Sequence, residues 1–180
     1  RLNSSGSGQI KTFYYDTATS DWVSKGVISG SSTTYKYTGT SVSLSVDGNK
    51  LATGTNYGTG VVRVFENVDD NGTPTWVKTS VDMYGENSND YFGTSVALSR
   101  DGKQMIIGAP GNDTYNSNSG KIYIYELELG KWRRITNSGT VYSNINFNIS
   151  DTNSTMSAVG NTVYFSSDST IVSTSLNNEN

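Results

Sequence analysis

The fold of this chain is decided by residues 91–110, which read Tyr91-Phe92-Gly93-Thr94-Ser95-Val96-Ala97-Leu98-Ser99-Arg100-Asp101-Gly102-Lys103-Gln104-Met105-Ile106-Ile107-Gly108-Ala109-Pro110. A short alternating segment ends at Leu98, and a second apolar run follows at 105–107. Asp101-Gly102 lies between them, and Asp-Gly between two such runs is a strong hairpin signal because glycine readily takes the positive φ of tight turns. The alternation with a period of two favours strands over a helix.

The same hairpin occurs twice more along the chain. An earlier copy reads Gly39-Thr40-Ser41-Val42-Ser43-Leu44-Ser45 and turns at Asp47-Gly48. A later, degenerate copy is recognised by aligning Val96 with Phe147, and in it Asn153 replaces the turn glycine. Asparagine is the next-best residue for positive φ, so we expect the turn to persist there.

Two further strands recur in the same order. A glycine opens an alternating strand at Gly8, Gly60 and Gly120, and a tryptophan opens the following strand at Trp22, Trp76 and Trp132. Each repeat therefore contains four short strands: the glycine-led strand, the tryptophan strand and the two strands of the Asp-Gly hairpin. A four-stranded unit recurring about every 55 residues is typical of a propeller blade.

The sequence therefore predicts an all-β protein, a β-propeller or partial propeller of about three four-stranded antiparallel blades. We expect a single repeat domain over residues 1–180, with units at roughly 8–59, 60–119 and 120–170. About four to eight blades are needed to close a propeller. The domain is therefore expected to be part of a larger propeller or assembly, or to form a homo-oligomer in which two copies complete one ring.

Side-chain size along the earlier hairpin indicates packing on both faces of the sheet. Val42 and Leu44 point to one face, and Ser41, Ser43 and Ser45 point to the other. Serine is small enough to let a neighbouring sheet approach closely. This pattern favours stacked blades over a sheet with one solvated face.

The landmarks Phe92-Gly93 and Gly108-Ala109-Pro110, with Ser-Val-Ala-Leu-Ser between them, resemble an FG-GAP repeat. That family builds the propeller heads of integrin α-chains and many extracellular proteins of microbes, algae and their viruses. The first unit is similar but has Tyr37-Thr38-Gly39 without the phenylalanine, and Gly54-Thr55-Asn56 in place of Gly-Ala-Pro. The third unit has lost both landmarks.

The resemblance does not carry the calcium sites of this family to the present chain. Calcium-binding members have a loop of alternating acids, whereas each hairpin turn here has a single carboxylate, Asp47 or Asp101. Calcium requires six or more oxygen ligands. The chain also lacks cysteine and histidine, which excludes thiolate and imidazole ligands. We therefore expect no metal site and no cofactor.

Charge and composition exclude other classes of function. The net charge is −3, with 13 Lys and Arg against 16 Asp and Glu, so no basic surface for nucleic acid is expected. No apolar run approaches the roughly 20 residues needed to cross a membrane. The chain begins at Arg1 without an initiator methionine and shows no signal peptide, so we interpret it as a processed product or part of a longer polypeptide.

No catalytic residues are predicted. Asp69 and Asp70 lie in an expected turn, and Glu126 and Glu128 near the end of an expected strand, where solvated carboxylates are common. The glycine-rich segment 54–60 lacks the lysine and the helix of a phosphate loop. The prediction is that the protein is not an enzyme.

Two loops that flank the second hairpin carry the candidate ligand-binding side chains, since Asn, Asp and Tyr can hydrogen-bond or stack on sugars and peptides. The candidates are Asn87, Asn89, Asp90, Asn112, Asp113 and Tyr115. N-x-S/T sequons add possible glycosylation sites at Asn71, Asn112 and Asn153.

The leading hypothesis is a non-enzymatic structural or adhesion module, extracellular or on a virion surface, that contacts proteins or cell surfaces through loops on a rigid scaffold. Its partners would be proteins or further propeller blades. One alternative is a propeller lectin that binds glycans, which exposed tryptophans at equivalent pockets would favour; we expect Trp22, Trp76 and Trp132 to be partly buried instead. Another alternative is an accessory propeller domain of a larger enzyme.

Overall fold

Every element that the structure describes is a β-strand. The computed structural model describes residues 6–31, 33, 35–70, 73–113, 120–135, 155–159, 162–167 and 170–175. The strands within these ranges are β1 (Gln9–Asp16), β2 (Asp21–Ser29), β3 (Ser41–Leu44), β4 (Lys50–Thr55), β5 (Val61–Asp70), β6 (Thr73–Lys78), β7 (Met83–Tyr84), β8 (Ser95–Leu98), β9 (Gln104–Ala109), β10 (Lys121–Glu128), β11 (Lys131–Arg134), β12 (Thr155–Val159), β13 (Thr162–Ser167) and β14 (Thr170–Ser175).

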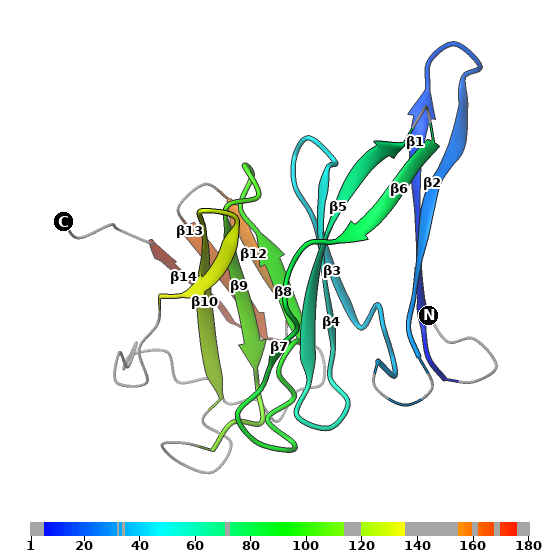
Figure 1. Cartoon of the computed structure of the whole chain (residues 1–180). Coiled ribbons are helices and arrows are strands. Elements are labelled where there is room, and N and C mark those ends of the chain that lie inside the picture. Colours follow the sequence, from blue (N-terminus) through cyan, green and yellow to red (C-terminus); the bar gives the residue numbers. More distant parts are fainter. Residues whose placement is uncertain are drawn as a thin grey trace.

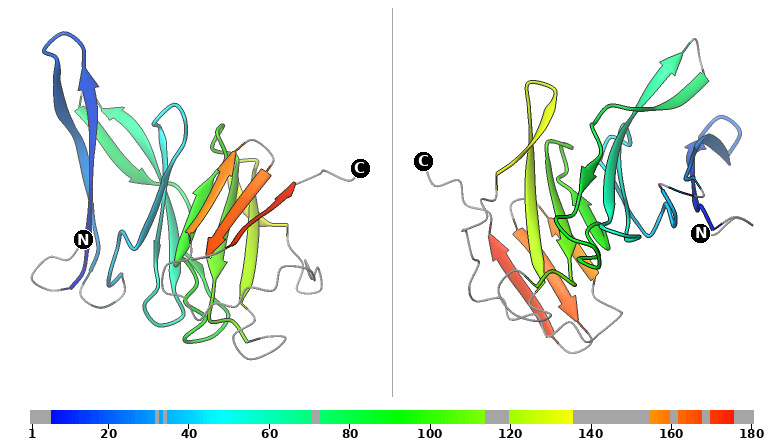
Figure 2. Two further views of the ribbon diagram at one scale, coloured as in Figure 1. Left: turned by 180° about the vertical axis from the view of Figure 1, so that it is seen from behind. Right: turned by 60° about the horizontal axis from the view of Figure 1, so that its bottom comes forward.

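Two sheets contain all four strands of the predicted repeat. One has the order β3-β4-β5-β6, with the short β7 also paired to β5, and the other has the order β8-β9-β10-β11. All pairings between the described strands are antiparallel, and apart from that of β5 with β7 they connect neighbours along the chain. The sheets stand side by side in an open arc and do not close a ring (Figures 1 and 2). The predicted all-β class and partial-propeller arrangement are thereby confirmed.

The first and last sheets contain fewer described strands. β1 pairs with β2, and β12, β13 and β14 form a three-stranded sheet. Register identifies β1 and β2 as outer strands, because Tyr15 opposite Trp22 repeats the pairing of Asn67 with Trp76. Each four-stranded sheet begins with its Asp-Gly hairpin and then adds the glycine-led and tryptophan strands. The sheets are thus offset in phase from the units 8–59, 60–119 and 120–170, and that division remains a prediction.

The main core lies between the two four-stranded sheets. Its most buried members come from facing sides of both sheets: Ala52, Val62, Val64, Met83, Phe92, Val96, Leu98, Met105, Ile107, Ala109, Tyr123 and Tyr125. Burial of such side chains contributes roughly 25 cal/mol per Å² of apolar surface removed from water. This interface is therefore the principal source of stability among the described residues.

Small residues on β3 allow this interface to form. The Oγ of Ser41 donates a hydrogen bond of 2.7 Å to the carbonyl oxygen of Gly93, and the Oγ of Ser43 accepts one of 2.9 Å from the amide of Leu98. A larger side chain at Ser43 would separate the two innermost strands. The expectation that these serines face a neighbouring sheet is confirmed.

A second, smaller core joins β1 and β2 to the next sheet. Ile10 and Ile28 pack on Leu51 and Phe65, with Trp76 partly buried against them. The indole Nε1 of Trp76 donates a hydrogen bond of 2.7 Å to Thr12 Oγ1. Because Tyr and Trp polar atoms need partners when buried, this bond also fixes how the two sheets sit against each other.

Backbone also meets backbone between repeats. Gly60 has a φ of +80°, and a Cβ built there would overlap the carbonyl oxygen of Phe92. Gly8 repeats the arrangement with a φ of +74° against Thr38. The glycine that opens each of these strands is therefore required both for its φ and for the close approach of the loop that precedes the hairpin.

We expect Gly60→Ala to destabilise the protein much more than Gly58→Ala. Both glycines have positive φ, so alanine at either costs about 1–2 kcal/mol in backbone strain. A Cβ at Gly60 would overlap backbone atoms of Phe92, whereas a Cβ at Gly58 would have no other atom within 4 Å. Steric overlap should add at least about 1 kcal/mol to the loss at Gly60. Chemical denaturation followed by tryptophan fluorescence checks this, and equal losses in the two variants would contradict it.

Candidate functional site

Four connections gather at one end of the arc, at the bottom of Figure 1, while the Asp-Gly turns lie at the opposite end. They join β2 to β3, β4 to β5, β7 to β8 and β9 to β10. The described residues of this loop end are 30–31, 33, 35–40, 56–60, 85–94 and 110–113. The loop end contains the described members of the predicted ligand-binding set.

Two tyrosines occupy equivalent places in the β2–β3 and β7–β8 connections of the loop end. Tyr37 has a φ of 58° and Tyr91 a φ of 55°, in the left-handed region that bulky residues rarely adopt. Each is held by a threonine three residues later, because Thr40 and Thr94 donate through both the amide and Oγ1 to the tyrosine carbonyl oxygen. Such strain costs about 1–3 kcal/mol and clusters at functional sites.

The tyrosine rings remain accessible to solvent. Tyr37, Tyr57 and Tyr91 are 38%, 47% and 45% exposed. The rings of Tyr37 and Tyr57 meet edge-to-face with centroids 5.9 Å apart, and Lys36 Nζ lies 4.6 Å from the Tyr57 centroid. Tyr91 instead lies over Gly111, where any Cβ would contact its ring. Together Tyr37, Tyr57 and Tyr91 are the aromatic surface of the loop end, and aromatic side chains are enriched in protein interfaces.

A polar network around Asp82, in the connection between β6 and β7, holds the β2–β3 connection that carries Tyr37. Asp82 accepts hydrogen bonds from Tyr35 Oη at 2.6 Å and from Lys78 Nζ at 2.8 Å, and a longer one from Tyr84 at 3.3 Å. Burial raises the pKa of Asp82, but the hydrogen bonds from Lys78, Tyr35 and Tyr84 outweigh burial, so the pKa lies below its usual value. The carboxylate raises the pKa of Tyr35 through the same hydrogen bond. Asp82 thus anchors the β2–β3 connection to β6 and β7.

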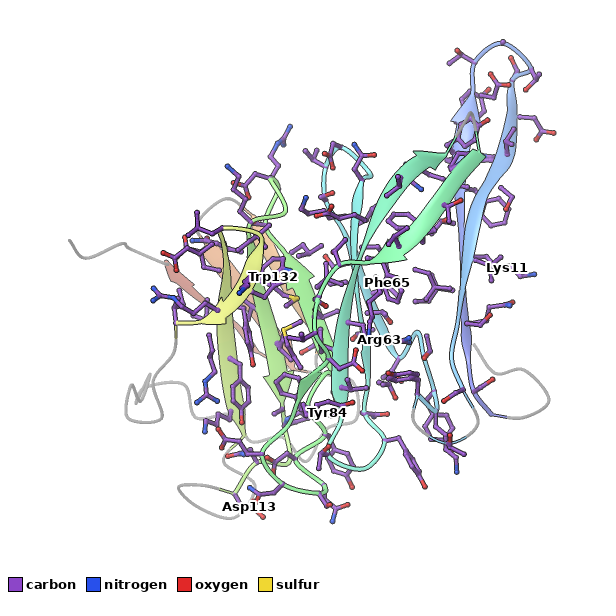
Figure 3. The ribbon with its side chains drawn as sticks, in the orientation of Figure 1. Lys11, Arg63, Phe65, Tyr84, Asp113 and Trp132 are labelled. Atoms are coloured by element: carbon purple, nitrogen blue, oxygen red, sulfur yellow. The ribbon has the colours of Figure 1, made fainter. Side chains whose placement is uncertain are left out.

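A buried arginine on β5 explains the missing phenylalanine of the first repeat. Arg63 is buried, donates through Nη2 to Thr38 Oγ1 at 2.8 Å, and has its guanidinium 4.2 Å from the Tyr35 ring centroid. In the next sheet the equivalent pair is Phe92 and Tyr123, whose rings meet edge-to-face at 5.1 Å. One repeat fills this position with an aromatic pair and the other with an arginine and a threonine. Figure 3 shows Arg63 and Phe65 on β5, beside the β1–β2 hairpin.

Two predicted site residues prove to be internal links between loops. Asn112 is fully buried and donates from Nδ2 to Asp90 Oδ2 at 2.7 Å. The same carboxylate oxygen accepts a hydrogen bond of 3.0 Å from the backbone amide of Asn87. The backbone carbonyl oxygen of Asp90 accepts one from the backbone amide of Gly111. These bonds hold the β7–β8 and β9–β10 connections together. Attachment of a glycan to Asn112 would require this fully buried side chain to become exposed.

The other predicted residues have different positions. Asn87, Asn89 and Asp113 are exposed on the loop end, and Asn89 has a positive φ of 70°. Tyr115, Asn71 and Asn153 lie outside the described residues. Ligand binding by these loops and glycosylation therefore remain predictions.

Sequence reasoning missed the tyrosines, although a signal was present. Tyr37 and Tyr91 each stand two residues before the repeat glycine, Gly39 or Gly93. A tyrosine that recurs in a loop has no core to fill. That position alone could have identified it as a candidate for binding.

The tryptophans are not displayed at equivalent pockets. Trp76 and Trp132 are partly buried against the two cores, as expected. Trp22, by contrast, is 65% exposed and contacts Tyr15 edge-to-face. It corresponds in register to Trp76, but no neighbouring described sheet covers it.

The described residues contain neither of the arrangements that metal sites and membrane-spanning helices require. Within it, no group of three Asp, Glu, His or Cys side chains could hold a metal ion. Glu128 forms an exposed ion pair with Arg133 at 3.1 Å, and residues 54–60 form the end of β4 and its connection to β5. None of the described residues belongs to a helix of the length and hydropathy that a membrane span needs.

Comparison with protein families identifies one repeat. Residues 84–125 match the family model of the FG-GAP repeat. The segment runs from the end of β7 into β10 and includes Tyr91, Phe92-Gly93 and the Gly108-Ala109-Pro110 landmark. The predicted resemblance is confirmed there, and an FG-GAP repeat suggests a module for protein–protein interaction. No curated protein matches the chain.

Replacing Asn112 with alanine should destabilise the protein by about 2 kcal/mol, because the buried Asp90 carboxylate would lose a hydrogen-bond donor. Asn87→Ala is the matched control, because the Asn87 side chain is exposed and the variant keeps the backbone amide that donates to Asp90. The control should change stability by less than about 0.5 kcal/mol. Urea denaturation of both variants measures the difference, and a neutral Asn112→Ala would show that the two loops are not linked through this pair.

Acid should weaken the protein partly through Asp82. Because its folded pKa is lowered, its contribution is complete above the unfolded pKa of about 3.9 and is lost as pH falls through the folded value. Asp82→Asn should therefore be less stable than the parent at neutral pH and should lose less on acidification. Thermal melts between about pH 6 and about pH 2 test this expectation. Parallel pH profiles for the two proteins would contradict it.

Proposed function

We propose that the protein is a non-enzymatic structural or adhesion module, working outside the cell or on a virion surface, that binds partner proteins through its loop end. The observation that carries this proposal is the repeated tyrosine at Tyr37 and Tyr91, held in a strained backbone and left half-exposed. A residue kept in such a conformation without filling a core has its ring available for a partner.

Physical properties of the loop end support a protein partner. Tyr37, Tyr57 and Tyr91 present large rigid rings that lose little side-chain entropy on binding. Lys36 adds a positive charge beside Tyr57, and Asp113 adds an acidic group in a neighbouring loop. Aromatic residues bordered by polar groups are typical of the centre and rim of protein interfaces.

The FG-GAP repeat at residues 84–125 supports the interaction role and an extracellular setting, since such repeats typically occur in extracellular proteins. The tryptophans do not favour the lectin alternative, because Trp76 and Trp132 are partly buried against the two cores and, of the three, only Trp22 is exposed. No observation favours the accessory-enzyme alternative over the interaction module.

The test replaces the aromatic surface without disturbing the fold. The triple variant Tyr37→Asn, Tyr57→Ser, Tyr91→Asn removes the three rings, and asparagine tolerates the positive φ at two of the positions. Binding to members of an extracellular-protein array should weaken at least about tenfold, as expected for interface hot spots. Stability should be unchanged or slightly higher because backbone strain is relieved.

Tyr14→Ser with Tyr15→Ser is the matched control, since both tyrosines are exposed on β1 away from the loop end. This control should keep full binding. Array partners that bind the triple variant as tightly as the parent would contradict the proposal. Binding confined to a glycan array would instead support the lectin alternative.

A further inference from the structure

Equivalent apolar residues of the two hairpins differ sharply in exposure. Val42 and Leu44 on β3 are 52% and 53% exposed, whereas Val96 and Leu98 on β8 are each 6% exposed. The two pairs occupy the same register: Val42 lies opposite Thr53, and Val96 opposite Ile107. The difference therefore lies in what covers each sheet and not in the strands themselves.

The covering of the β8 face is a complete hairpin from the preceding sheet. β3 and β4 pack on this face, and Ala52 belongs to the same core as Val96 and Leu98. Ser41 and Ser43 on β3 secure the contact through hydrogen bonds to the Gly93 carbonyl and the Leu98 amide. The β3–β4 hairpin on the β8 face thus shows how a hairpin covers this kind of face. No described hairpin covers the equivalent face at Val42 and Leu44.

The sheet that should cover β3 lacks these inner strands among the described residues. In the complete sheets, the glycine-led strands β5 and β10 each pair on both sides. β1 corresponds to them but pairs in the described structure with β2 alone. β1 and β2 cover only the outer part of the neighbouring sheet, at Leu51, Phe65 and Trp76.

We propose that the open edge of β1 and the adjoining Val42–Leu44 face form one docking slot for a two-stranded antiparallel β-hairpin of the same repeat. Its second strand pairs with β1, and its first strand lies over Val42 and Leu44. The first strand carries small residues at two alternate positions, as β3 does with Ser41 and Ser43. These contact the Gly39 carbonyl and the Leu44 amide, which correspond to Gly93 and Leu98. The slot is continuous with the established contact of Ile10 and Ile28 on Leu51.

The occupant is a hairpin joined to the N-terminal side of β1. In both four-stranded sheets the hairpin directly precedes the glycine-led strand: β3–β4 before β5, and β8–β9 before β10. In the last sheet the β12–β13 hairpin likewise precedes its third strand, β14. The β12–β13 hairpin of a second copy fits less well. The edge of β13 that would have to meet β1 is already paired with β14.

A fusion tests the slot directly. A second copy of residues 92–113 is placed ahead of Arg1, so that residues 110–113 and 1–7 connect it to Gly8. That connection closely matches in length the segment 110–119, which joins β9 to Gly120. The fused chain should melt at a higher temperature than the parent, and the backbone amides of β1 should gain protection from hydrogen exchange.

Substitution at Val42 distinguishes docking from general stabilisation. In the parent, Val42→Ala should change the unfolding constant little, whereas Val96→Ala should raise it roughly tenfold or more because Val96 is buried. In the fused chain, Val42→Ala should become as damaging as Val96→Ala. The matched control is a fusion whose grafted copy carries lysine in place of Ser95 and Ala97, which should abolish both the added stability and the new sensitivity at Val42.

Several results would overturn the proposal. One is a fused chain whose β1 amides exchange as in the parent and whose Val42→Ala variant remains neutral. Another is a fused chain that fails to fold although the lysine control folds. A third is an unfused chain that light scattering shows to be a dimer and whose Val42 backbone amide gains protection from hydrogen exchange as the protein concentration rises. A second copy would then be the occupant. These readouts are independent of the tyrosine surface, so failure here leaves the proposed function untouched.

Discussion

The close approach of one sheet to the next is the constraint on which the rest of the structure depends. It requires serine at Ser41 and Ser43, whose hydroxyls bond to the facing backbone, and glycine at Gly60, where a Cβ would strike the preceding loop of the next hairpin. Side chains of any larger size would separate the sheets and open the core. A twisted sheet with two apolar faces is stable only when both are covered, which is why the repeats stack.

This constraint concerns backbone and small residues, so the core between sheets can vary. The Phe92–Tyr123 pair of one repeat is replaced in the other by Thr38 and Arg63, with the guanidinium lying against an aromatic ring. Both solutions fill the same volume behind the loop end. The loops are thereby held rigidly enough to keep tyrosine in a strained conformation.

Much of the fold was predictable because its signals are local. Alternation and Asp-Gly identified the hairpins at 91–110 and 39–54, and small residues identified the face at which sheets meet. The candidate site was harder to predict. Asp90 and Asn112 are residue types that often bind ligands. In the structure they form a hydrogen bond with each other, because two loops distant in sequence lie side by side. For Tyr37 and Tyr91 the sequence holds one signal, their recurrence two residues before the repeat glycine, whereas the backbone φ at these two positions cannot be read from residue type.

The sequence by itself determined most of the strands and their order along the chain, because period, turn chemistry and glycine position act over a few residues. It placed Asp69 and Asp70 in a turn, whereas β5 continues through both and pairs them with β6. Only the tertiary structure decided which apolar residues are buried. Val42 and Val96 belong to the same pattern and lie on equivalent strands, but one is half-exposed and the other buried. The physical reason is that burial of a strand's apolar face depends on the neighbouring sheet. An alternating pattern indicates that the face is apolar, but it does not indicate whether another sheet covers it.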